Sequence, residues 1–268
     1  MLRTRIVTAL VLAALMLWAL LALPVPGKIA CIALLMAIGA WEWAAFARLT
    51  AWPARALYVG VALALGAFAW RYWGGSSDWP RVLQLAAVWW IIALIWVTCA
   101  PHAINRTAAG VAGYLILVPA WFALARLLSV PGPTGTWLAI FMLTLVFAGD
   151  VGAYFAGRGL GRSKLAPSVS PNKTWEGFAG GMIAGLIVAA VGANLFHLPL
   201  GPFLALCAVV LVASVVGDLT ESMFKRYAGL KDSGRLLPGH GGVLDRIDSV
   251  TAAGPFFVLG LKALGMMP

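Results

Sequence analysis

Long apolar runs, separated by short polar or turn-forming stretches, make up most of this chain. Several runs approach the roughly 17–25 residues that an α-helix needs to cross the hydrocarbon core of a bilayer. The interruptions carry turn residues, as at 24–27 and 131–133. The pattern predicts about nine helices, near Ile6–Leu23, Ile29–Ala47, Ala56–Trp70, Val82–Val97, Ala108–Leu128, Trp137–Phe155, Phe178–Phe196, Phe203–Val216 and Val250–Leu264.

Composition shows which solvent surrounds these helices. Of the 268 residues, 62% are hydrophobic and only 10% are charged. Soluble domains carry about 25% charged residues, so lipid must cover much of this surface. The sequence therefore predicts an all-α, polytopic integral membrane protein, folded as a single membrane domain over residues 1–268.

The positive charges predict how the protein is oriented. With nine spans, fourteen of the nineteen lysines and arginines fall on the side of the N-terminus. Basic loops stay in the cytoplasm, so we expect a cytoplasmic N-terminus and an external C-terminus. The net charge of +10 is explained by this topology and by attraction to anionic lipid. Nucleic-acid binding is not expected, because no basic soluble domain is present.

The acidic residues divide the chain into two parts. Only Glu42 and Asp78 precede residue 136, whereas the other seven of the nine carboxylates follow it. We therefore expect scaffold helices in residues 1–135 and a catalytic half in residues 136–268. The catalytic half contains two long polar stretches, predicted as cytoplasmic loops 156–177 and 217–249.

The first loop combines glycines with cationic and polar side chains that suit a phosphate ester. Its candidate substrate-binding residues are Ser170, Asn172 and Lys173. A simpler interpretation also fits the end of this loop, in which Thr174 caps a helix and Glu176 lies in its first turn. The loop lacks the pattern of a P-loop nucleotide site.

The second loop is richer in reactive residue types. Asp218 lies three residues before Glu221 and four before Ser222, a spacing that places all three on one helical face. Asp245 and Asp248 repeat the spacing of three. Magnesium prefers oxygen ligands and often binds through one or two carboxylates plus substrate phosphates, so Asp218 and Asp245 are the predicted metal ligands.

Cationic and glycine-rich positions lie between these acids. They would neutralise a triphosphate and let backbone amides approach phosphate oxygens. The candidates are Lys225, Arg226, Lys231, Arg235, His240, Gly241, Gly242 and Arg246. An ordinary helix pair with Lys225 is the favoured interpretation for Glu221. Asp248 is left open as a helix cap, a partner of Arg246 or a support for the metal site, a role also open to Asp150.

The segment from Ser222 to Asp248 resembles the signature of the phosphatidate cytidylyltransferase family, the CDP-diacylglycerol synthases. A second, upstream motif of that family is similar to residues 170–177. The matching positions in the longer segment are Ser222, Lys225, Arg226, Lys231, Asp232, His240, Gly241, Gly242, Asp245, Arg246 and Asp248.

The resemblance implies magnesium-dependent transfer of CMP from CTP to phosphatidate at the bacterial cytoplasmic membrane, with release of pyrophosphate. Family metal ligands correspond to Asp218 and Asp245. The expected catalytic residues are Asp218, Lys225, Asp245, Arg246 and Asp248. The partners would be CTP, phosphatidate and bilayer lipid. A homodimer and an additional monovalent cation are left open.

Two other functions are weighed against this one. A transporter for an anionic solute would use the basic loops as a gate, but transporters place their polar groups near the midplane. A CDP-alcohol phosphotransferase would need a different acidic pattern, which does not begin at Asp150.

Overall fold

The computed structural model describes residues 2–237 and 239–267, without the side chains of residues 2–7 and 9. The predicted cytoplasmic charges of Arg3 and Arg5 therefore lie outside the described side chains. The helices are α1 (Leu2–Ala22), α2 (Val25–Phe46), α3 (Trp52–Trp73), α4 (Pro80–Cys99), α5 (Arg106–Leu128), α6 (Thr134–Leu160), α7 (Trp175–Leu195), α8 (Leu200–Tyr227) and α9 (Leu244–Ala263).

Each predicted apolar run coincides with one of these helices, which confirms the mainly helical, polytopic architecture. Seven helices of the described chain, α2 to α8, are long and apolar enough to cross a membrane. The helix α1 contains only a shorter apolar stretch, Leu10–Ala22, and α9 is not among the seven. The number of nine membrane spans is therefore not confirmed.

Two boundaries differ from the prediction because a helix does not end where its apolar run ends. The predicted loop 217–249 is helical at both ends, since α8 continues to Tyr227 and α9 begins at Leu244. The predicted loop 156–177 contains the end of α6 and a two-stranded antiparallel hairpin. Its strands, β1 (Lys164–Ala166) and β2 (Ser170–Thr174), pair Lys164 with Thr174 and Ala166 with Ser170.

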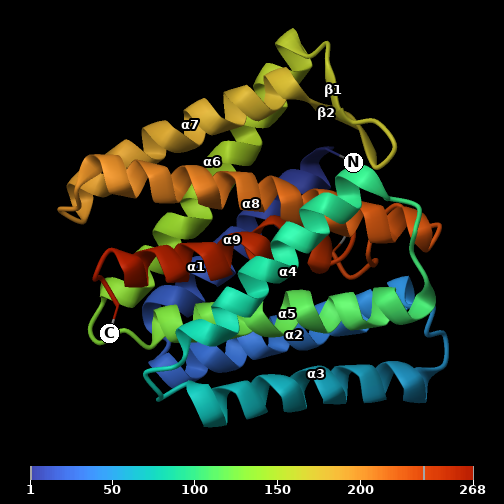
Figure 1. Ribbon diagram of the computed structural model, residues 1–268, viewed down its shortest axis with the longest axis horizontal. Coiled ribbons are helices and arrows are strands. Elements are labelled where there is room, and N and C mark those ends of the chain that lie inside the picture. The colour runs from blue at the N-terminus through green and yellow to red at the C-terminus, as the bar shows by residue number, and fades with distance from the viewer. Residues whose placement is uncertain (1, 238, 268) are drawn as a thin grey trace.

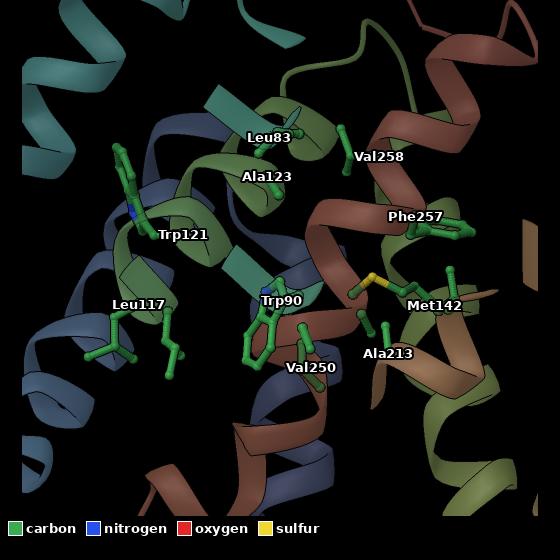
Figure 2. Close-up of a cluster of buried hydrophobic side chains, with 14 of the residues drawn as sticks. Leu83, Trp90, Leu117, Trp121, Ala123, Met142, Ala213, Val250, Phe257 and Val258 are labelled. Carbon is green, nitrogen blue, oxygen red and sulfur yellow. The ribbon is translucent and has the colours of Figure 1, made fainter. Parts of the chain in front are cut away.

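The helices surround α9 (Figure 1). One group, α2, α3 and α5, lies on one side, α7 and the hairpin lie on the other, and α6 runs between the two sides. Between them α9 contacts α2, α4, α5, α6 and α8. Figure 2 shows Val250 and Phe257 of α9 among Trp90 of α4, Trp121 of α5 and Met142 of α6. These packed apolar side chains hold the polar N-terminal end of α9 in place.

Candidate functional site

The C-terminal part of α8 presents one polar face. The hydroxyl of Ser222 donates to Oδ1 of Asp218 over 3.3 Å. One turn further, Nζ of Lys225 lies 3.3 Å from Oε1 of the buried Glu221. The shared face and the Glu221–Lys225 pair that the sequence predicted are both confirmed.

A close approach between α8 and α9 brings a further acid to this face. A Cβ at Gly217 would lie 2.6 Å from the carbonyl oxygen of Asp248, so only glycine lets the two backbones come this near. Asp248 consequently interacts electrostatically with both Asp218 and Glu221. It lies inside α9 rather than at its cap, and its Oδ1 accepts a hydrogen bond from the amide of Ser249.

Asp245, in the first turn of α9, is enclosed by donors. Its Oδ1 accepts from Nζ of Lys225 over 2.7 Å, and its side chain is only 6% exposed. Its Oδ2 accepts from the amide of Gly242 and from both the amide and the hydroxyl of Ser233, over 2.8 to 3.0 Å. Burial disfavours the charged form, but these hydrogen bonds hold the pKa of the Asp245 carboxyl below its usual range.

The hairpin carries the first polar loop onto α8. Nζ of Lys173, on β2, lies 2.6 Å from Oδ2 of Asp218. Thr174 caps α7 as predicted, because its hydroxyl accepts from the amide of Gly177 over 3.1 Å. Glu176 accepts hydrogen bonds from the amides of residues 162 and 163, just before β1. The cap and these bonds fix the hairpin, so the two polar loops meet at the Lys173–Asp218 pair.

A cavity of about 610 Å³ opens beside this pair, between α6, α7, α8 and the hairpin. Asp150, Asn172, Lys173 and Asp218 line it with polar groups, whereas most of the lining is apolar. The apolar residues include Leu165, Phe178, Met182, Leu211 and Val215. Such a cavity can receive a molecule that has a charged head and a hydrocarbon part.

The chain matches the cytidylyltransferase family over residues 3–264. The chain belongs to this family. It is 42% identical to the phosphatidate cytidylyltransferase of Pseudomonas aeruginosa over 99% of this chain and 98% of that protein. It is 39% identical to the phosphatidate cytidylyltransferase of Haemophilus influenzae, over 96% and 97% of the two chains. The Bacillus subtilis phosphatidate cytidylyltransferase is 45% identical over 47% of this chain and 49% of its own length.

The other predicted substrate residues of this cytidylyltransferase-family chain are dispersed. Arg226 lines a second cavity, of about 280 Å³, with His102 and Ser168. Lys231, Arg235 and Arg246 are exposed. His240 donates its amide to the carbonyl of Leu237 over 2.9 Å. Gly241 adopts a φ of +82°, and the amide of Gly242 is already bonded to Asp245. Ser170 is half-buried on β2, and Asn172 is exposed.

Three contributors to the site were missed or undervalued in the sequence. Tyr154 and Arg158 line the large cavity with Asp150, and Nη1 of Arg158 donates to the hydroxyl of Tyr154 over 2.8 Å. Asp150, Tyr154 and Arg158 follow one another at intervals of four residues, which places all three on one face of α6. Glu42 of α2 hydrogen-bonds the polar segment before α9. A single carboxylate inside an otherwise apolar run was the signal available in the sequence.

The carboxylates form an electrostatic network rather than a compact cage. Asp218 interacts with Asp150 and Asp248, while Asp245 is paired with Lys225. Among the described residues, no group of three Asp, Glu, His or Cys side chains is arranged to hold a metal ion. The Asp218–Asp245 metal pair therefore stays a prediction.

Proposed function

We propose that this protein transfers CMP from CTP to phosphatidate, forming CDP-diacylglycerol and pyrophosphate. The observation that carries the proposal is the 42% identity, over nearly the whole of both chains, to a protein named phosphatidate cytidylyltransferase. The names of the relatives favour neither the anionic-solute transporter nor the CDP-alcohol phosphotransferase. The amphipathic cavity beside Lys173 and Asp218 supports a lipid phosphate as one substrate.

The reaction needs little proton transfer. An oxygen of the phosphatidate phosphomonoester attacks the α-phosphorus of CTP, a new P–O bond forms, and the bond to pyrophosphate breaks with its electron pair going to the pyrophosphate. Both reactants are polyanions, so the barrier lies in bringing them together and in stabilising the leaving group. Fixed cations at the site serve both purposes.

We assign this charge stabilisation to two lysines. Lys173 and Lys225 each neutralise an aspartate, Asp218 and Asp245 respectively, at 2.6 and 2.7 Å. We assign the catalytic roles to Asp218, Lys225, Asp245, Arg246 and Asp248. Substrate phosphates and nucleotide would be bound by Ser170, Asn172, Lys173, Arg226, Lys231, Arg235, His240, Gly241 and Gly242.

A magnesium ion fits the chemistry of these donors. Asp218 is repelled by Asp150 and Asp248, and a cation would relieve that repulsion. We propose that Asp218 and Asp245 hold the ion, because magnesium usually takes one or two carboxylates together with substrate phosphates. Bound magnesium would screen the two polyanions and stabilise the pyrophosphate. An additional monovalent cation belongs to the same proposal.

The proposal also covers how the protein and its lipid substrate lie in the membrane. The apolar lining of the large cavity would leave the acyl chains in lipid while the phosphate meets Lys173. We propose nine membrane spans in the bacterial inner membrane, with the N-terminus in the cytoplasm and the C-terminus outside. The protein would bind no nucleic acid, and a homodimer is compatible with this arrangement.

Pyrophosphate release tests the activity directly. Purified protein in detergent micelles receives CTP, phosphatidate and magnesium, with reactions lacking either substrate as controls. We expect pyrophosphate and CDP-diacylglycerol in equal amounts, only when both substrates are present. Folded protein that forms neither product would contradict the proposal.

A further inference from the structure

Glu42 is a buried carboxylate in the half of the chain that was expected to be a scaffold. Glu42 lies in α2 and is 6% exposed. Its carboxylate accepts three hydrogen bonds from the other half of the chain. Its Oε2 accepts from the amide of Leu244 over 2.8 Å and from the hydroxyl of Ser233 over 2.9 Å. Its Oε1 accepts from the amide of Val243 over 3.1 Å.

Two of these bonds cap α9. The first amides of a helix have no partner within the helix, and the N-cap residue of α9, Val243, has an apolar side chain that cannot accept them. The carboxylate of Glu42, which belongs to another helix, accepts the hydrogen bonds of these amides instead. Its negative charge is also favourable at a helix N-terminus. Glu42 thus fixes the turn of α9 that carries Asp245.

The third bond reaches Asp245 itself. The hydroxyl of Ser233 lies 2.9 Å from Oε2 of Glu42 and 3.0 Å from Oδ2 of Asp245. The amide of Asp245 also approaches this hydroxyl, at 3.3 Å. A Cβ at Gly242 would collide with the Ser233 hydroxyl and the Glu42 carboxylate. Glu42, Ser233 and Asp245 therefore form one tightly packed unit.

We infer that Glu42 is a positioning residue for the reaction: through Ser233 and the first amides of α9 it sets the place of the Asp245 carboxylate. The inference rests on the proposed CMP transfer at this site. It extends to the loop before α9, because Ser233 lies between the exposed Lys231 and Arg235. Anchoring Ser233 would restrict the movement of the segment that carries both of these cations.

The test compares Glu42→Gln with Glu42→Asp and with Asp78→Asn. Asp78 is the matched control, since it is the other acid of the first half and its exposed side chain forms a surface ion pair with Arg81. We expect Glu42→Gln to lower kcat by about 10- to 100-fold, as is typical when a hydrogen-bond partner of a site ligand is lost. KM for CTP should stay within about twofold, Glu42→Asp should recover part of kcat, and Asp78→Asn should match the wild type.

A second readout does not depend on activity. Trypsin can cut the detergent-solubilised protein after Lys231 or Arg235, and a segment that opens more often is cut faster. We expect Glu42→Gln to accelerate these two cuts about tenfold or more, with Asp78→Asn unchanged. Unaltered kcat and unaltered cleavage in folded Glu42→Gln would overturn the inference. If the wild type released no pyrophosphate, the proposed function would fail, while the cleavage rates would still test Glu42.

Ser233→Ala tests the positioning role of Glu42 if Glu42→Gln does not fold. This variant removes only the hydroxyl bridge, and it should lower kcat and accelerate cleavage after Lys231 or Arg235. Wild-type values of both would overturn the inference. Where both single variants fold, the double variant should lose little more than Glu42→Gln alone, because residues of one unit are not additive. Fully additive losses would contradict the bridge.

Discussion

Asp245, in the first turn of α9, and Asp218, in the C-terminal part of α8, are acids of two neighbouring helices, but the protein surrounds them differently. The Asp245 side chain is 6% exposed and bonded to Lys225, Ser233 and Gly242. The Asp218 side chain is 30% exposed, pairs with Lys173 and faces a cavity. The enclosed acid is held by the protein, whereas the open acid can exchange its partner. We therefore expect the Asp245 carboxylate to stay fixed and the Asp218 carboxylate to adapt when substrate binds.

The largest effect is expected for Asp245→Asn. The variant should insert normally, yet lose about 10³-fold in kcat, as when a fixed electrostatic group is removed from a site. Its free energy of unfolding should fall by about 3 kcal/mol, because a buried partner of Lys225 loses its charge. Pyrophosphate release and thermal unfolding in detergent measure the two effects. A near-normal rate would remove Asp245 from the site.

Asp218→Asn should separate activity from stability. We expect a loss of about 10²-fold in kcat. The free energy of unfolding should change by less than about 1 kcal/mol, because partly exposed ion pairs contribute little. The same two assays apply. A loss of stability equal to that of Asp245→Asn would remove the distinction between the enclosed and the open acid.

Gly217→Ala tests the helix contact that brings the two acids together. The new methyl group would meet the carbonyl oxygen of Asp248, so α8 and α9 must shift. We expect a cost of about 1–3 kcal/mol in unfolding free energy. A displacement of the catalytic groups should also lower kcat by about tenfold. Wild-type stability and rate would show that the close contact is not required.

Arg226→Ala should have the smallest effect. Arg226 is exposed and lines the second cavity rather than the large one. The KM for CTP should rise no more than about fivefold, because an exposed ion pair contributes at most about 1 kcal/mol of binding free energy. The kcat should not change. A loss of kcat as large as that of Asp218→Asn would place Arg226 at the reacting groups.

Most of the fold could be predicted from the sequence, because apolar runs in lipid must be helical to satisfy their backbone. The ends of the helices could be predicted less well. The helix α8 continues to Tyr227, beyond the predicted Val216, since its hydrogen bonding does not stop where the side chains become polar. The hairpin of residues 164–174 was missed because three residues of β1 give too short a pattern.

The site could be predicted only where it is local. The Asp218–Ser222 and Glu221–Lys225 contacts follow from helical spacing. The pairing of Lys173 with Asp218 joins β2 to α8, and that of Glu42 with Leu244 joins two residues 202 positions apart. Helical periodicity contains no information on such distant pairs, which are set by the packing around α9.

Chemical labelling of the two lysines compares the open and the enclosed position most directly. An acylating reagent is applied to the folded protein with and without phosphatidate, and the labelled residues are identified by mass spectrometry. We expect Lys173 to react and to be protected by phosphatidate, and Lys225 to react only after unfolding, since Lys225 is enclosed between Glu221 and Asp245. Rapid labelling of Lys225 in the folded protein, or labelling of Lys173 that phosphatidate does not change, would contradict this account.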